Sequence, residues 1–291
     1  MWFAITKYQL GITRRSGGFP DPAAWKDYGY DLDSRTTTAD DSKSSINSCK
    51  RRSGSPTRVL LDGNDGRDNN FGQHVMSVIK SLKADAEEAV NATVSDGTAT
   101  LLLKLDNVGG DNNGKVPGEL FVAVQRGSCG GTNWSIDIRS LDATKAAKVK
   151  YPNGYMAGGV WVSGDFAKES IQLPLPWLGH LLTLPLQGGV ISFRPFSGES
   201  GTIAGLSTTD GLKEALTPLF KQYGICPGNA TYDQVVETMA QSADLVVGAP
   251  SFQDMTRECN AISLGLGFFA EKIVQPDCRV TGTGPGPSEC P

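Results

Sequence analysis

Acidic and amide side chains are concentrated in one short loop, residues 62–72, which reads DGNDGRDNNFG. Calcium takes roughly six to eight oxygen ligands, which protein loops supply from closely spaced Asp and Asn side chains and from backbone carbonyls. Gly63 and Gly66 would let the chain turn sharply between such ligands. The sequence therefore predicts a calcium site whose candidate ligands are Asp62, Asn64, Asp65, Asp68 and Asn69.

This loop departs from the EF-hand pattern, because Gln73 stands where the bidentate glutamate would be. The alternative interpretation is an Asx-rich turn that leads into a helix, since acidic groups are favoured at helix N-termini. Two further Asx clusters, at residues 106–114 and 31–33, share the ambiguity. The first lies between two predicted strands and fits a hairpin loop, and the second is the weaker candidate.

Catalytic motifs are sparse in this chain. It has neither a G-x-S-x-G serine motif nor a glycine-rich phosphate loop, and its two histidines, His74 and His180, lack a placed nucleophile. A pair of carboxylates could hydrolyse glycosides. The acidic residues in or near predicted strands are Asp137, Asp165, Glu169 and Glu199. Solvated strand-face charges are the more common explanation, so we assign no catalytic residue and consider an enzyme the less favoured reading.

The cysteines indicate disulfide bonds. They are Cys49, Cys129, Cys226, Cys259, Cys278 and Cys290. None forms a C-x-x-C pair, which disfavours zinc, and an even, scattered set is typical of an oxidising compartment. The alternative is a set of free, buried thiols. Because Cys226 follows a predicted helix and Cys259 begins the last strand, Cys226–Cys259 is the favoured pair, and the pairing of the other four stays open.

The elements that would position these residues are mostly strands. The 291 residues include 35 glycines and 16 prolines, which suits short strands joined by tight turns. Strands are predicted at residues 98–106, 119–125, 134–138, 157–163, 170–175, 180–186, 190–196 and 261–269. We expect a mainly β fold, an antiparallel, jelly-roll-like β-sandwich with roughly two or three short helices packed on or between its strands. An α+β arrangement is the alternative.

Two strand predictions are specific. In residues 261–269, Ile262, Leu264, Leu266 and Phe268 alternate with small residues, which predicts a central strand whose small face packs closely against another segment. Prolines at positions 174, 176 and 185 predict edge strands or broken strands, because proline cannot donate to a sheet.

Helices are predicted near residues 70–91, 210–223 and 231–245. In the first, the residues that share one apolar stripe are Val75, Ile79, Leu82, Ala86 and Val90. Asn69 or Asn70 would cap this helix. We expect residues 1–60 to be an irregular N-terminal segment packed on the body, residues 61–274 to be a single β-rich domain, and residues 275–291 to be a Gly/Pro-rich tail tethered by disulfides.

Charge and hydropathy exclude two classes of partner. The net charge is −4 and only 20% of residues are charged, so no basic field is present for nucleic acid. No stretch approaches the roughly 18–20 apolar residues of a transmembrane helix. Residues 1–10 contain no uninterrupted hydrophobic run and no small-residue cleavage site, so we expect the signal or lipid-anchor segment to be absent from the given sequence.

Several segments together resemble a known group of proteins. They are residues 25–33 (WKDYGYDLD), 65–72 (DGRDNNFG), 155–162 (YMAGGVWV), 201–205 (GTIAG) and 261–265 (AISLG). In this order they resemble exported bacterial lipoprotein-like proteins, a group with no assigned activity. The resemblance spans residues 2–269 and implies export, but it transfers no functional residue.

The leading hypothesis is a secreted or surface-anchored, non-enzymatic β-sandwich module of the cell envelope. We expect calcium to stabilise it and a glycan, a lipid or a protein to be its partner, with Trp134, Trp161 and Trp177 as sugar-stacking platforms if they are exposed. The alternatives are a secreted glycosidase-like hydrolase and a structural envelope protein.

Overall fold

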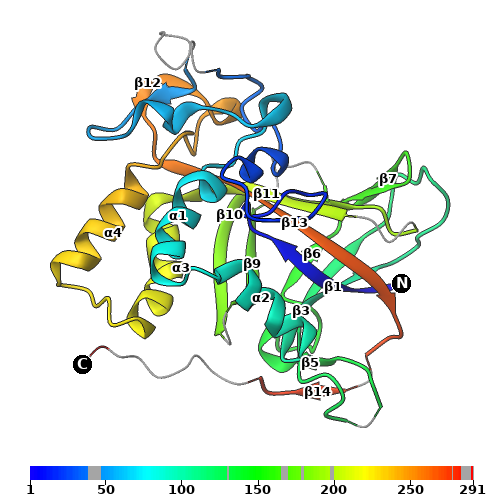
Figure 1. Ribbon diagram of the computed structural model, residues 1–291. Helices are drawn as coiled ribbons and strands as arrows, with labels where there is room; N and C mark the ends of the chain where they lie inside the picture. The colour runs from blue at the N-terminus through cyan, green and yellow to red at the C-terminus, as the bar shows by residue number, and fades with distance from the viewer. Residues whose placement is uncertain are drawn as a thin grey trace.

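One large sheet dominates the computed structural model, which describes residues 1–38, 47–129, 131–164, 170–177, 180–196, 200–276, 278–282 and 290 (Figure 1). Its strands are β1 (Trp2–Gln9), β3 (Ala99–Leu105), β4 (Gly118–Val124), β5 (Ser135–Asp137), β6 (Val149–Tyr151), β7 (Tyr155–Ala157), β8 (Val160–Val162), β9 (Ser170–Trp177), β10 (His180–Phe193), β11 (Ser200–Thr208), β13 (Ala261–Ile273) and β14 (Arg279–Val280). A separate parallel pair consists of β2 (Cys49–Lys50) and β12 (Asp254–Glu258).

The strands of the large sheet follow the order β14-β5-β4-β3-β1-β13-β11-β10-β8-β7, with β6 beside β4 and β9 beside β10. The described pairs in this sheet are antiparallel except for β14 with β5. β9 also contacts β3, β4 and β6, so the sheet folds across itself as a sandwich around the main core. The predicted mainly β fold is confirmed.

The two faces of the sheet carry separate apolar clusters. In β1, Phe3 and Ile5 belong to the main core inside the sandwich, whereas Ala4 belongs to a smaller cluster on the opposite face. Aromatic rings fill the main core, where the ring of Phe193 lies 5.1 Å from that of Phe3 and 5.9 Å from that of Trp161. The opposite, outer face is therefore partly apolar and needs to be covered.

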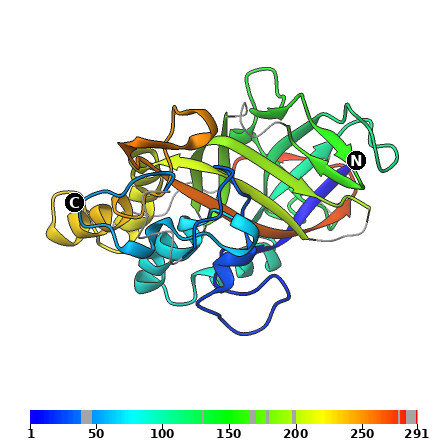
Figure 2. The same cartoon turned by 90° about the horizontal axis from the view of Figure 1, so that it is seen from above.

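Helices lie beside the sheet and at one end of it (Figures 1 and 2). They are the π-helical turn η5 (Phe71–Val75), α1 (Met76–Leu82), α2 (Ala86–Ser95), α3 (Thr209–Gln222) and α4 (Ala230–Ala240). Short 3₁₀ turns are η1 (Ala24–Asp27), η3 (Thr57–Leu60), η4 (Asn64–Gly66), η6 (Ile138–Ser140) and η7 (Pro250–Phe252). α2 packs on β1, β3 and β9, and α3 packs on β10 and β11. No described helix is long and apolar enough to cross a membrane.

The helix predicted near residues 70–91 is broken into two. Lys83 has φ −142° and ψ 95°, which ends α1, and α2 begins at Ala86. The apolar stripe keeps its spacing across the break, with Ile79 and Val90 both buried, so periodicity could not reveal the interruption. The helices predicted near residues 210–223 and 231–245 correspond to α3 and α4. The side chain of Asn229 caps α4.

The expectation that residues 1–60 are irregular needs a correction. β1 lies in the middle of the sheet, between β3 and β13. A bulge between Ile5 and Lys7 leaves Thr6 and Lys7 exposed and interrupts the alternation of buried and exposed residues. A period-2 search therefore does not recognise this strand.

Three disulfide bonds use all the cysteines, and the favoured pair Cys226–Cys259 was wrong. The bonds are Cys49–Cys259, Cys129–Cys278 and Cys226–Cys290. Cys259 pairs with Cys49 because β12 runs beside β2, which brings their Cα atoms to 5.3 Å. Cys226 instead meets the C-terminal tail. The tail is tethered through Cys278 and Cys290, as predicted.

β13 is a central strand, as its sequence pattern predicted. It pairs with β1 and β11, and its apolar side chains enter the main core. On its small face the segment Tyr28–Gly29 crosses so closely that a Cβ on Gly265 would lie 2.6 Å from the Cα of Gly29. This crossing delivers the following residues, 30–33, to the segment at 62–68.

The proline prediction is confirmed for β9. Its Pro174 and Pro176 lie in a strand whose ladder, among the described strands, runs only along β10, and this edge position tolerates the missing N–H groups. Pro185, in contrast, lies inside the long strand β10, in the half that pairs with β9.

Candidate metal centre

Four carboxylates meet where residues 31–33 lie against residues 62–68. Carboxylate oxygens of Asp31, Asp33 and Asp68 all lie within 4.8 Å of one another. The carboxylate of Asp62 lies at hydrogen-bonding distance from that of Asp68. Asp33 and Asp68 are only 1% and 3% exposed, whereas Asp31 is exposed. We refer to Asp31, Asp33, Asp62 and Asp68 as the carboxylate cluster.

Backbone amides orient the two carboxylates of the 62–68 segment. The N–H of Leu32 donates to Oδ2 of Asp68 at 2.7 Å, and the N–H of Thr37 donates to Oδ2 of Asp62. Both donors come from the N-terminal segment, so each of these bonds links residues 31–37 to residues 62–68. These bonds fix the two segments relative to each other, and a preformed ligand site requires such an arrangement.

The two carboxylates of the 31–33 segment are held by another local set of donors. The N–H of Arg35 lies 2.9 Å from Oδ1 of Asp33 and 3.1 Å from Oδ1 of Asp31. The hydroxyl of Ser48 donates to Oδ2 of Asp33. Ser48 precedes Cys49, so the Cys49–Cys259 bond holds this donor in place.

The charge of Arg35 acts on Asp33, but burial outweighs it and raises the pKa of Asp33. None of the four carboxylates forms an ion pair with Lys or Arg in the described part of the chain. Burial, with the charge of Asp33 adding to it, raises the pKa of Asp62 to about 7. Burial and the charges of Asp33 and Asp62 raise the pKa of Asp68 well above its usual range. At neutral pH the cluster therefore has to bind a cation or retain protons.

A fifth carboxyl group, that of Asp244, is buried and lies close enough for the charges of Asp62 and Asp33 to act on it. Burial raises its pKa well above the usual range, before these charges add to the effect. Its oxygens accept from the hydroxyl and from the backbone N–H of Ser263 in β13. Asp244 thus lies behind the cluster with its own oxygens engaged by protein donors.

Of the five ligands predicted from the sequence, Asp62 and Asp68 lie in the cluster. Asn64 instead donates to Oδ1 of Asp27 at 2.9 Å. The side chain of Asp65 is 83% exposed and pairs with Arg67 at 3.2 Å. The structure therefore directs these two side chains away from the cluster.

Asn69 joins three parts of the fold. Its Oδ1 accepts from the N–H groups of Gly72 and Gly265, at 3.0 and 2.9 Å, and its Nδ2 donates to the carbonyl of Trp25 at 3.1 Å. These bonds cap the start of the helical segment, as predicted for Asn69 or Asn70, and fasten it to β13. Both polar atoms of the amide are thus engaged within the protein.

Sequence reasoning undervalued Asp31 and Asp33. They form a short D-x-D pattern far from residue 62 in the chain, and only the crossing over β13 brings the two segments together. The available signal was the repetition of Asx residues in both segments, which does not show that the segments meet.

The donor set favours a hard cation. Its side chains offer only carboxylate oxygens, and all the cysteines are in disulfides, so thiolate chemistry is unavailable. Calcium accepts several carboxylates together with backbone carbonyls and water, whereas magnesium demands a more regular octahedron. The residues present therefore fit calcium, and Asp31, Asp33, Asp62 and Asp68 are the side chains that could hold it.

An open groove of about 830 Å³ borders the cluster and shares Asp31 with it. Its lining residues are Tyr30, Asp31, Tyr155, Val160, Val162, Gly164, Val190 and Ser192. Trp134, Trp161 and Trp177 are at most 5% exposed and belong to apolar clusters, so they cannot serve as stacking platforms. The aromatic groups that reach this groove are the two tyrosines.

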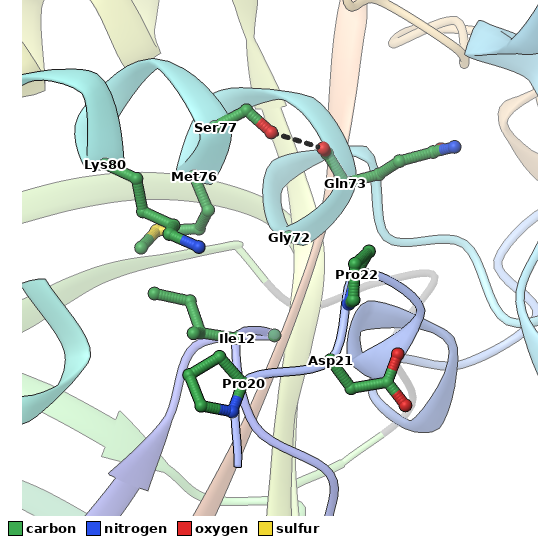
Figure 3. Close-up of a pocket in the computed structure, with 10 residues that line it drawn as sticks. Ile12, Pro20, Asp21, Pro22, Gly72, Gln73, Met76, Ser77 and Lys80 are labelled. Carbon is green, nitrogen blue, oxygen red and sulfur yellow. Dashed lines mark hydrogen bonds between the residues drawn. The ribbon is translucent and has the colours of Figure 1, made fainter. Parts of the chain in front are cut away.

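A smaller pocket of about 240 Å³ lies between α1 and the loop that follows β1 (Figure 3). Ile12 and Pro20 face Met76 across it, and the side chain of Lys80 lies beside Met76. Its one carboxylate, Asp21, is held by Arg14 at 2.7 Å. The pocket lacks a convergent set of polar groups, so we do not treat it as the site.

The residues considered for hydrolysis do not form a described site. Asp137 is fully buried in an ion pair with Arg139, 2.5 Å away. Asp165, Glu169 and Glu199 lie outside the described residues, and so does the side chain of His180. His74 is largely buried, which lowers its pKa, and its Nε2 has no hydrogen-bond partner in the described structure.

We compared the chain with protein-family models, curated proteins and solved structures, and none of them matches it. The carboxylate cluster and the groove beside it are therefore the features on which a function can be based. The disulfides add a chemical context, because such bonds form and persist in an oxidising environment.

Proposed function

We propose that this protein is a non-enzymatic, calcium-stabilised β-sandwich module of the bacterial cell envelope, secreted or anchored at the surface, which binds a partner in the groove beside the carboxylate cluster. One observation carries the proposal. Four carboxyl groups, two of them almost fully buried, converge, and none of them forms an ion pair with Lys or Arg in the described part of the chain. An isolated buried charge is costly, so a bound cation would stabilise the folded state strongly.

Calcium would act as a cross-link between distant parts of the chain. Asp31 and Asp33 come from the segment that follows the crossing over β13, and Asp62 and Asp68 come from the segment that leads into the helices. An ion held by both segments would fasten the N-terminal segment to the outer face of the sheet. Because Asp31 also lines the groove, the same ion would fix one wall of the groove.

The disulfide bonds support the proposal that the protein is exported. Three disulfides, one of which is nearly fully buried at Cys49 and Cys259, are expected in a protein that folds in an oxidising compartment. Resemblance to lipoprotein-like proteins points the same way. No described observation favours the hydrolase alternative, because Asp137 is committed to Arg139.

Thermal unfolding in EDTA and in calcium tests the proposal. A ligand present at about 100 times its Kd stabilises the folded state by about 2.7 kcal/mol, so we expect calcium to raise the Tm by roughly 5 °C or more. Magnesium at the same concentration should raise it less, because the cluster is irregular. Equal melting temperatures in EDTA and in calcium would overturn the proposal.

Two matched variants assign the effect to the cluster. Asp68→Asn keeps an oxygen that can accept from Leu32 but removes one buried charge, so it should raise the Tm in EDTA and abolish most of the response to calcium. Asp65→Asn removes an exposed charge from the same loop and should leave the calcium response unchanged. A calcium response that survives Asp68→Asn and disappears in Asp65→Asn would place the ion at the exposed turn instead.

A further inference from the structure

The floor of the groove is an apolar part of the outer face of the sheet. Trp161 of β8 and Ile191 of β10 point into the main core. Their chain neighbours Val160, Val162 and Val190 consequently point outward, where alternation usually places polar side chains in a solvated sheet. Val160 and Val162 are half-buried and Val190 is 5% exposed, so together they give the groove an apolar floor that suits a ligand.

Elsewhere the chain covers this outer face with its own segments. The N-terminal segment covers β11 and β13, and Arg15 donates to the carbonyl of Gly201 at 3.0 Å. Among the described residues, this cover ends at Tyr30 and Asp31, which form one wall of the groove.

Strand register places the two tyrosines on opposite sides of Val162. Ser192 of β10 pairs with Val162 of β8, and Val162 pairs with Tyr155 of β7. The hydroxyl of Tyr30 is hydrogen-bonded to that of Ser192, which fixes its ring at the β10 side. Two strand spacings separate Ser192 from Tyr155, so the tyrosines stand roughly 10 Å apart with a valine between them.

The charge at the groove is negative. The exposed carboxylate of Asp31 lines it. Charge complementarity therefore selects a cation. The apolar floor selects a weakly hydrated cation, and the tyrosine rings attract a positive charge placed against their faces.

We propose that the groove binds a small, soluble monocation of the quaternary ammonium class, with its methyl groups on the valines, its charge between Tyr30 and Tyr155, and Asp31 as the counter-charge. This inference goes beyond the proposed calcium function, and because both proposals use Asp31, ligand binding is tested without calcium. A phosphate next to the ammonium group would be repelled by the carboxylate of Asp31, so the ligand is a free cation rather than a phosphocholine group.

Calorimetric titration in EDTA tests the ligand class directly. Choline is the probe, 3,3-dimethylbutan-1-ol is its neutral analogue of the same shape, and phosphocholine adds the phosphate. We expect choline to bind at least about tenfold more tightly than either comparison compound. Absence of saturable choline binding, equal binding of the neutral analogue, or tighter binding of phosphocholine would overturn the proposal.

Variants locate the binding in the groove. Tyr155→Leu keeps an apolar side chain but removes a ring, and it should weaken choline roughly threefold to fivefold. Asp31→Asn should weaken it by a similar or larger factor, whereas Asp85→Asn removes an exposed carboxylate paired with Lys83 and should have no effect. Equal affinities in all variants would place the ligand elsewhere.

The two proposals fail in different measurements. Choline binding in EDTA without any calcium-dependent melting would contradict only the proposed calcium site. Calcium-dependent melting without choline binding would contradict only the proposed ammonium site.

Discussion

Asp62 shows how far its surroundings can change one side chain. Its carboxyl is mostly buried beside Asp33 and Asp68, and its pKa is raised from 3.8 to about 7. Sequence alone suggested Asp62 because of its spacing from other oxygen donors. The reason it matters is burial among like charges, which spacing does not show.

The raised pKa predicts how stability depends on pH when calcium is absent. A carboxyl whose pKa is higher in the folded state than in the unfolded state favours the folded state while it is protonated, and this contribution is lost as pH rises through the folded pKa. In EDTA, the free energy of unfolding should therefore fall between about pH 4 and pH 8. Denaturant titrations across this range measure it.

Calcium and Asp62→Asn serve as controls for this pH dependence. Both should reduce the fall in stability, because the ion balances the charge and the amide does not titrate. A stability that rises from pH 4 to pH 8 in EDTA would contradict a buried, unbalanced cluster.

At the scale of elements, β13 is the strand on which the site depends. Its large side chains fill the core, and its small face admits the crossing segment that carries Asp31 and Asp33. The same strand provides the N–H of Gly265 to Asn69 and the hydroxyl of Ser263 to Asp244. One strand thus holds both segments of the cluster.

Gly265→Ala should disturb this crossing. The new Cβ would lie 2.6 Å from the Cα of Gly29, in a place where two backbones leave no room for adjustment. We expect a loss of roughly 3 kcal/mol in the free energy of unfolding, together with weaker binding of calcium. Urea denaturation and calcium titration measure the two effects.

Gly109→Ala is the matched control for this substitution, because nothing lies within 4 Å of its Cβ position. It should change stability by less than about 1 kcal/mol. Equal effects of the two substitutions would show that the close approach at Gly265 is not maintained in solution.

At the scale of the whole molecule, the disulfides connect segments that are far apart in the chain. Cys49–Cys259 closes a separation of 210 residues and lies next to Ser48, whose hydroxyl donates to Asp33. Cys226–Cys290 closes a separation of 64 residues and fastens the tail near the end of α3. Only the first bond is connected to the carboxylate cluster.

Removing each of these bonds should therefore have a different effect. The double variant Cys49→Ala/Cys259→Ala should lose about 3–5 kcal/mol of stability and bind calcium more weakly. The variant Cys226→Ala/Cys290→Ala should lose less stability and bind calcium normally. Denaturant unfolding and calcium titration of both variants check this, and unchanged calcium affinity in the first would separate the disulfide from the site.

Local sequence patterns and composition were enough to predict several structural properties of this protein. Alternation in residues 261–269 identified the central strand, glycine and proline content identified a mainly β fold, and cysteine number indicated disulfides. These properties depend on neighbours within a few residues or on composition, so they can be read without knowing the fold. β1 escaped detection because a bulge interrupts its alternation.

Tertiary structure alone decided which distant groups meet. The pairing of Cys259 with Cys49 follows from β12 lying beside β2, and the joining of Asp31 and Asp33 to Asp62 and Asp68 follows from the crossing over Gly265. Neither meeting leaves a local signal, because many long-range pairings are compatible with the same local preferences. The loop at residues 62–72 supplied two carboxylates of the cluster, and the packing of the chain supplied the other two.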